Sequence, residues 1–219
     1  MAANFTSSAT NMSLSNTYTG PAAQNVTIMA WIYITSTSPN TYRYICSQQG
    51  AGIALILGSG TVGTTANYGS DAINNLGRTV PINRWTHLAM TVRFDSVSRA
   101  YYTGYFNGQV DVRFDDSLRT YSTYTSWAIG NDGTGGAFPF NGRIRDVRVW
   151  GRALSGTEVW QNMMSMTPIG PSGMIFWLPL DQDLYLDRGS GRGENFTVGS
   201  AVTLAPSEFR MPPLKRRPF

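Results

Sequence analysis

The chain has 219 residues, of which 14% are charged and 12% are aromatic, and it contains 23 glycines. This composition argues against a helical bundle, which would need more Glu, Lys, Leu and Ala. It is typical of short strands joined by glycine-containing turns. The single cysteine, Cys46, excludes a disulfide within the chain. Much of the net charge of +4 comes from basic residues near the C-terminus, so we expect no specific nucleic-acid-binding face.

The first residues, Met1-Ala2-Ala3-Asn4-Phe5, contain neither the basic segment nor the apolar segment of a signal peptide. No apolar run approaches the roughly 18 residues that a membrane-spanning helix requires. We therefore expect synthesis in the cytoplasm, with no signal peptide and no membrane span.

Apolar segments in the first half of the chain predict strands. Val26–Ile34 reads VTIMAWIYI and is apolar on both alternating faces, which predicts a strand covered on both sides. Ile53–Leu57 is a short apolar run between two glycines, again typical of a strand. Residues 85–94 alternate and place Leu88, Met90 and Val92 on one apolar face.

A hairpin is predicted around Asn107-Gly108, because these residues tolerate the positive φ angles of a type I′ turn. The flanking segments are residues 100–106 and 109–114. In the second segment Val110, Val112 and Phe114 alternate with polar residues, which predicts one buried and one wet face.

The last third of the chain predicts two strands and a helix. Gly142–Trp150 alternates as a strand, and residues 174–180 form a late strand in which Pro179 marks an edge or an end. Between them, Ser155 and Glu158 have the spacing of a capping box, and Leu154 and Val159 that of a hydrophobic staple. We expect a short helix over residues 156–165.

Residues 206–219 read PSEFRMPPLKRRPF and cannot form a core, so we expect them to be an extended arm. Residues 1–205 are expected to form one domain. With about a dozen short strands and one helix, the pattern predicts an all-β, two-sheet antiparallel sandwich.

Four ordered segments resemble signatures of one family, the concanavalin A-like lectin/glucanase domains of laminin G and pentraxin type. They are residues 28–33 (IMAWIY), 84–89 (RWTHLA), 105–109 (YFNGQ) and 140–155 (FNGRIRDVRVWGRALS). The resemblance covers about residues 5–165 and implies a jelly-roll sandwich.

A further family segment is found late in the chain. Residues 176–180 (FWLPL), followed by residues 187–195 (DRGSGRGEN), are similar to a stretch that normally precedes the rest of such domains. Either the domain is circularly permuted, or this segment supplies the same strand from the other terminus. The arrangement, with a Pro- and Arg-rich end, resembles structural proteins of tailed bacteriophages.

Catalysis is not expected. The family includes glycoside hydrolases, which need two carboxylates around the scissile bond. Here Glu158 is explained as a helix cap, and Glu194 and Glu208 lie in a glycine-rich loop and in the arm. Asp181 and Asp183 form the nearest acidic pair, directly after a proline, and we do not interpret them as catalytic.

His87, the one histidine, lies within the family-like RWTHLA segment, so we interpret it as structural rather than as a base or a metal ligand. Cys46 is interpreted as a small buried apolar residue. No cofactor is required by either interpretation.

Calcium is the metal that the resemblance suggests, held by carboxylate and carbonyl oxygens. The family's usual I-D-D-V reads Ile144-Arg145-Asp146-Val147, and Arg145 in place of the first acid argues against a family-type calcium site. The alternative is that Arg145 occupies that space by pairing with a nearby acid. Asp187 and Asn195 retain part of the other half. The alternative is a turn in which Asp187 makes an Asx-type hydrogen bond.

Carbohydrate binding would need exposed aromatic and polar groups on loops. The candidates are Tyr68 with Asp71 and Asn74, and Asn131 with Asp132; Tyr121, Tyr124 and Trp127 form another aromatic cluster. The alternative is that these residues belong to the core and to ordinary loops.

Two functions are consistent with these observations. The first is a non-enzymatic virion protein, a capsid decoration, neck or tail component that docks on other virion subunits or on copies of itself. Its docking arm would present Arg210, Lys215, Arg216, Arg217 and Phe219, since arginine binds carboxylates and proline lowers the entropic cost of ordering. The second is a lectin module that binds cell-surface glycans for host adsorption.

Overall fold

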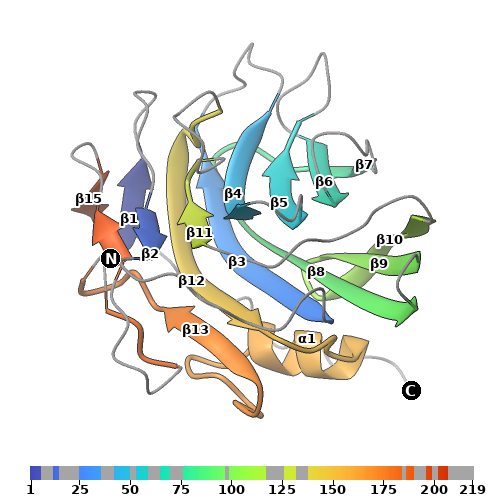
Figure 1. The fold of residues 1–219 in the computed structure, drawn as a ribbon. Helices are drawn as coiled ribbons and strands as arrows, with labels where there is room; N and C mark the ends of the chain where they lie inside the picture. The colour runs from blue at the N-terminus through green and yellow to red at the C-terminus, as the bar shows by residue number, and fades with distance from the viewer. Residues whose placement is uncertain are drawn as a thin grey trace.

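The structure is a computed structural model, drawn as a ribbon in Figure 1. The residues that it describes are 1–5, 12–14, 25–35, 42–49, 53–58, 65–69, 76–96, 99–116, 126–131, 138–183, 186–189, 196–198 and 202–206. Within them, no helix has the length and apolar character needed to span a membrane.

The described strands form two antiparallel sheets that face each other, as the sequence predicted. Sheet A has the order β10 (Gln109–Asp116), β9 (Arg99–Phe106), β8 (Trp85–Ser96), β3 (Val26–Ile34), β12 (Gly142–Trp150), β1 (Ala2–Phe5) and β15 (Val202–Ala205), with β13 (Met174–Leu178) also paired to β12. Sheet B has the order β14 (Phe196–Val198), β2 (Met12–Leu14), β11 (Ser126–Ile129), β4 (Arg43–Gln49), β5 (Ile53–Leu57), β6 (Thr65–Gly69) and β7 (Leu76–Thr79). The helix α1 (Gly156–Met163) follows β12.

One edge of β12 is divided between strands from the two ends of the chain. β1 pairs with its first part, where Ala3 lies opposite Ile144, and β13 pairs with its second part, where Val149 lies opposite Phe176. β15 extends the sheet beyond β1, and β14 pairs with β2 in the other sheet. The late strand β13 therefore lies along the same edge of β12 as β1. The strands of residues 174–205 thus extend both sheets next to N-terminal strands (Figure 1).

The core lies between the sheets. Ile28, Leu55 and Trp127 are among its fully buried side chains, and the ring of Trp127 meets Phe176 edge-on at 5.6 Å. Gly130 has a φ of +81°, and a Cβ there would overlap the ring of Phe5. Cys46 is buried in the same cluster, as predicted, and burial raises the pKa of its thiol.

The predicted hairpin is confirmed, with φ angles of 48° at Asn107 and 73° at Gly108. The Asn107 side chain fixes the turn to β8, because its Oδ1 accepts a hydrogen bond from the His87 N–H (2.9 Å). The alternation predicted for the second strand is wrong at Val110, which is 40% exposed. A β-bulge between Val110 and Val112 shifts the register there, so the side chains do not continue one simple alternation.

The predicted capping box is confirmed: the Ser155 hydroxyl accepts from the Glu158 N–H, and the Glu158 carboxylate accepts from the Ser155 N–H. Leu154 and Val159 share one buried cluster, as expected for a staple. The helix ends at Met163 rather than at residue 165, because the Ser165 N–H donates to the Asn162 carbonyl and closes the last turn early.

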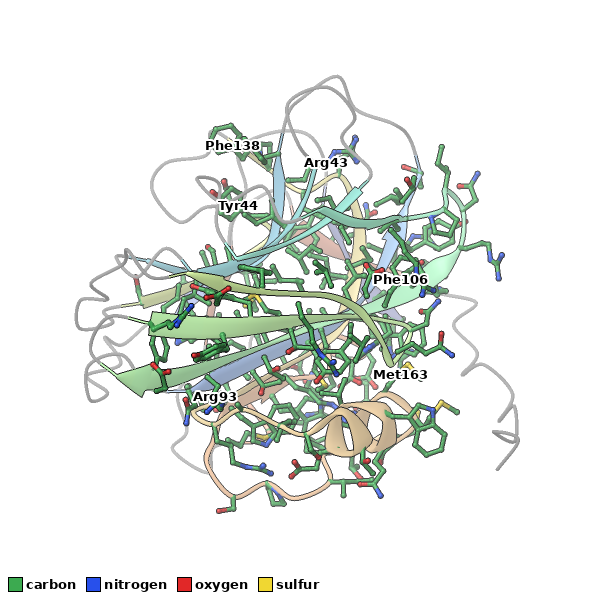
Figure 2. The ribbon with its side chains drawn as sticks, turned by 90° about the vertical axis from the view of Figure 1, so that its right-hand side faces the viewer. Arg43, Tyr44, Arg93, Phe106, Phe138 and Met163 are labelled. Atoms are coloured by element: carbon green, nitrogen blue, oxygen red, sulfur yellow. The ribbon has the colours of Figure 1, made fainter. Side chains whose placement is uncertain are left out.

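A second apolar layer explains why β3 is buried on both faces. Figure 2 shows the layers from the side, with Tyr44 and Phe138 beyond one sheet and Met163 of α1 beyond the other. On the outer side of sheet A, Met29, Ala89, Tyr105 and Trp150 pack with residues at and before α1. The strand prediction for Val26–Ile34 is therefore correct, because α1 covers the face that the core does not.

Candidate functional site

The structure describes two of the predicted sugar-binding residues, Tyr68 and Asn131, which lie in or next to strands of sheet B. Tyr68 lies in β6, opposite Leu55 of β5. Asn131 follows β11, and it is buried; its carbonyl accepts a hydrogen bond from the Ser47 hydroxyl (3.1 Å). Three antiparallel pairings separate β11 from β6, so these two strands run in opposite directions. Trp127 belongs to the core, and the remaining candidates lie outside the described residues: Asp71, Asn74, Asp132, Tyr121 and Tyr124.

Asp187 has the Asx-type hydrogen bond of the second alternative. Its Oδ1 accepts from the Gly189 N–H (2.8 Å) and from the Trp177 N–H (2.9 Å), so it fastens the glycine-rich turn to β13. Asn195 lies outside the described residues. Among the described residues, no group of three or more His, Cys, Asp or Glu side chains is placed to hold a metal ion.

The acids nearest to a catalytic pattern each have a structural partner. Arg145 pairs with Asp181 at 3.6 Å, which confirms the expected pairing with a nearby carboxylate. Arg188 pairs with Asp183 at 2.8 Å. Glu158 accepts from Ser155 and from Arg152, and the backbone hydrogen bond from Ser155 is the main cause that lowers its pKa. Glu194, Glu208 and the predicted docking arm lie outside the described residues.

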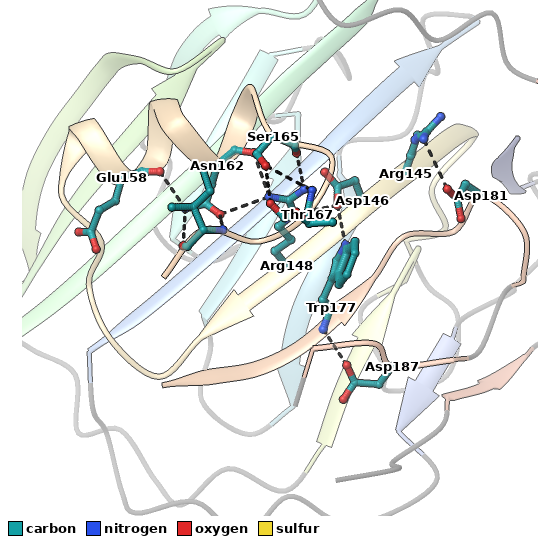
Figure 3. A network of polar contacts seen from close by, with 11 residues as sticks. Arg145, Asp146, Arg148, Glu158, Asn162, Ser165, Thr167, Trp177, Asp181 and Asp187 are labelled. Atoms are coloured by element: carbon teal, nitrogen blue, oxygen red, sulfur yellow. Dashed lines mark hydrogen bonds and ion pairs between the residues drawn. The ribbon is translucent and has the colours of Figure 1, made fainter. Parts of the chain in front are cut away.

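A buried polar network links β12 to α1 and β13, as Figure 3 shows. Its centre is Arg148, whose side chain is completely buried. Arg148 donates from Nε to Asp146 Oδ1 (2.8 Å), from Nη1 to the Asn162 carbonyl (2.9 Å) and from Nη2 to the Ser165 carbonyl (2.6 Å). Its guanidinium also lies 5.7 Å from the centre of the Trp177 ring. Each nitrogen of this cation has a partner, so the network stabilises the fold and has no free group for chemistry.

Asp146 is positioned by an interruption of β12. It has a φ of +55°, and the pairing with β3 shifts between Arg145 and Arg148. This β-bulge lets Asp146 Oδ1 accept both from Arg148 and from Trp177 Nε1 (2.7 Å). Burial raises the pKa of Asp146, whereas the charge of Arg148 opposes that effect.

His87 is structural, as the sequence suggested. It is 2% exposed, and its ring meets the ring of Trp31 edge-on at 5.2 Å. Burial lowers the pKa of His87, and together with the nearby charge of Arg148 it brings the value to about 3. The imidazole is therefore neutral at physiological pH and has no access to a substrate.

A partly exposed row of side chains crosses the outer face of sheet A. The pairings place one residue of each of five neighbouring strands in register: Thr203, Asn4, Arg143, Tyr33 and Trp85. All five are partly or fully exposed. We call this set the aromatic row. In Figure 1, α1 lies beside the C-terminal end of β12, whereas the row crosses the other end.

The aromatic row has defined internal contacts. The rings of Tyr33 and Trp85 are 5.6 Å apart and tilted by 54°. The Arg143 guanidinium lies 5.4 Å from the centre of the Tyr33 ring, and its Nη1 donates to the Pro206 carbonyl (3.1 Å). Two aromatic rings, an amide and a guanidinium are thus held together on a rigid sheet. Sequence reasoning missed this site because it looked for binding groups on loops.

Another aromatic cluster lies on the outer face of sheet B. The Phe138 ring is 5.8 Å from Tyr42 and 5.9 Å from Tyr44. Tyr44 is buried, and all three side chains pack on Ala54 and Ile56 of the sheet. This cluster therefore covers part of the outer face of sheet B.

The two antiparallel sheets packed face to face, with α1 on the outer side of sheet A, form a lectin-like β-sandwich. A family model of the concanavalin A-like lectin/glucanases superfamily matches residues 6–160, and the chain belongs to this family. No curated protein matches the chain.

Solved structures share this fold. A protein from Bacteroides ovatus assigned as carbohydrate binding is similar over 92% of this chain, with a TM-score of 0.68 and 21% identity; the match covers 58% of that protein. A heptameric pentraxin from Limulus polyphemus is similar over 90% of this chain and 93% of its own, with a TM-score of 0.52 and 15% identity. The structural similarity to these two proteins shows a shared fold.

Proposed function

We propose that this domain is a non-catalytic carbohydrate-binding module whose binding surface is the aromatic row. The observation that carries the proposal is the partly exposed pair Tyr33 and Trp85, held side by side on sheet A next to Asn4 and Arg143. Aromatic rings present an apolar face that can pack against the C–H face of a sugar ring. The amide and the guanidinium supply donors, and the amide also an acceptor, for the sugar hydroxyls.

The position of the row supports binding rather than folding as its role. The residues of the row lie on strands that are paired with one another in sheet A. The rings of Tyr33 and Trp85 therefore need little reorganisation when a ligand binds. The likeness to the Bacteroides ovatus protein is consistent with this proposal but concerns the fold alone.

A non-catalytic role fits the state of the acids. Asp181, Asp183 and Glu158 are paired with arginines, and Asp146 lies in the buried network. A glycosidase needs one carboxylic acid to donate a proton and a second carboxylate to act as base or nucleophile. The pKa of Glu158 is lowered, mainly by the backbone hydrogen bond from Ser155, so its carboxylate is a poor proton donor.

The virion role predicted from the sequence depends on residues 206–219, which lie outside the described residues. It stays a prediction, and it is compatible with glycan binding by the folded domain.

The test is a glycan screen of the full chain, followed by titration calorimetry of any glycan that binds. On an open surface of this size we expect a Kd on the order of 0.1–1 mM. Trp85→Ala should abolish binding, whereas Tyr101→Ala, which removes a partly exposed ring at the far end of sheet A, should leave it unchanged. Absence of binding by the folded wild-type chain across the screen would reject the proposed function.

A further inference from the structure

The aromatic row contains a cation whose charge no described acid neutralises. The Arg143 guanidinium donates to a carbonyl and lies over a ring, but no carboxylate of the described residues is within ion-pair distance of it. Its neighbour on the same strand, Arg145, is paired with Asp181 instead. Arg84, which precedes Trp85, is also exposed. The row therefore has a local excess of positive charge.

At the opposite end of sheet A, a comparable set of arginines and a tyrosine also includes acidic side chains. There Tyr101 is flanked by Arg93, 4.8 Å from its ring centre, and by Arg99 at 5.6 Å. Asp115 accepts from Arg99 Nε (2.9 Å), and Asp95 accepts from the Tyr101 hydroxyl (2.9 Å). We call this set the Tyr101 cluster. Both ends of one sheet thus place an arginine over a tyrosine, and acids complete only the Tyr101 cluster.

The Tyr101 cluster includes two carboxylates, Asp95 and Asp115, whereas the described residues of the aromatic row include none. From this difference we infer that the aromatic row binds acidic saccharides, with Arg143 receiving a sugar carboxylate while Tyr33 and Trp85 carry the sugar rings. The inference rests on the proposed function and specifies its ligand class. A guanidinium matches a carboxylate with two parallel N–H donors, and such charge-assisted hydrogen bonds are the stronger ones.

The setting of Arg143 favours this role. Its Nη1 is held by the Pro206 carbonyl and its plane by the Tyr33 ring, so the fork is already ordered before a ligand arrives. Desolvation is modest because the side chain is only partly buried. A carboxylate that replaces water at Arg143 gains an ion pair, and the guanidinium stays solvated when no ligand is bound.

The dimensions of the row favour a chain rather than a single sugar. Five neighbouring strands contribute one residue each, so the row spans four strand spacings, or about 19 Å. Asn4 and Thr203 extend it with uncharged polar groups beyond Arg143. We therefore expect an acidic oligosaccharide to lie across the strands, with its ring on Tyr33 and Trp85 and its acid group on Arg143.

The experiment compares carboxylated, sulfated and neutral oligosaccharides on one array, followed by calorimetry with a uronic acid tetrasaccharide and its methyl ester. The full chain is used, and thermal melting verifies that each variant is folded. We expect binding to the acid form, on the order of tenfold weaker binding to the ester and with Arg143→Gln, and partial recovery with Arg143→Lys. Binding should also weaken when NaCl rises, since salt screens exposed charges.

The Tyr101 cluster provides the matched control. Arg93→Gln removes the same charge from above a tyrosine at the far end of the sheet and should leave affinity unchanged. Preference for sulfated over carboxylated sugars would overturn the assignment of the carboxylate.

The outcomes separate this inference from the proposed function. Binding of neutral glycans that requires Trp85 but not Arg143 would overturn the acidic ligand class and leave the module a carbohydrate-binding one. Binding of acidic glycans that survives both Arg143→Gln and Trp85→Ala would place the site elsewhere and overturn this inference. If no glycan binds the folded chain, the proposed function fails, and this inference fails with it.

Discussion

Arg143 and Arg148 lie on the same strand, five positions apart, yet they have different roles. Both guanidinium groups lie over an aromatic ring, Tyr33 for Arg143 and Trp177 for Arg148. Arg148 is covered by α1 and the segment after it, and Asp146 compensates its charge. Arg143 lies on the half of sheet A that the helix does not cover. The element packed above an arginine, rather than the arginine itself, decides whether it stabilises the fold or presents a charge to solvent.

The strongest test of this comparison removes the buried cation. Arg148→Ala leaves Asp146 with an uncompensated buried charge and two carbonyls without donors, so we expect a loss of about 3–5 kcal/mol in the free energy of unfolding. Urea denaturation measures it. The double variant Arg148→Met with Asp146→Leu should recover much of the loss, because an apolar pair needs no charge compensation. A loss below about 1 kcal/mol for Arg148→Ala would contradict the assigned role of the network.

Acidification probes the same covered half through His87. Its pKa is about 3 in the folded state and 6.5 in the unfolded state. Between these values the unfolded chain binds a proton that the folded chain does not, so stability falls as pH drops from 6.5 towards 3, by a few kcal/mol in total. Denaturation at pH 7 and pH 4 measures this difference. His87→Leu should show a smaller difference than the wild type; an equal difference would show that other groups cause it.

The capping box at Ser155 and Glu158 stabilises the start of α1, the helix that covers part of sheet A. Ser155→Ala removes the hydroxyl that accepts from the Glu158 N–H, and we expect a loss of about 1 kcal/mol in the free energy of unfolding. Thr157→Ala is a suitable control because Thr157 is an exposed residue of the same helical turn. Equal effects of the two substitutions would mean that helix propensity, not capping, is being measured.

The smallest effect on stability is expected for Arg143→Gln. The side chain is partly exposed and has no carboxylate partner among the described residues, so the free energy of unfolding should change by less than about 1 kcal/mol. Urea denaturation beside Arg148→Ala gives the direct comparison. A loss as large as that of Arg148→Ala would erase the distinction between the two halves of the sheet.

Much of the fold could be predicted from local patterns. The apolar run of β3, the turn at Asn107 and Gly108, and the capping box at Ser155 each contain their own signal within a few residues. The register between strands contains no such signal. The aromatic row consists of residues from five strands that are distant in sequence, and its exposure depends on where α1 stops covering sheet A. Val26–Ile34 is correctly predicted as a strand covered on both sides, but its sequence does not reveal that Tyr33 remains partly exposed where the cover ends.

The shared edge of β12 also determines when this protein can fold during synthesis. β1 is synthesised before its neighbours in sheet A. Its outer edge pairs with β15, and the second part of β12 pairs with β13, and both strands are made later. The pairing of β1 with β15 joins residues about 200 positions apart, and contacts of such long range form slowly. Until residues 174–205 have been made, both sheets retain open edges that could pair with another chain. Residues 174–205 therefore cover the edges of β1, β2 and the second part of β12, which would otherwise be open to pairing with another chain.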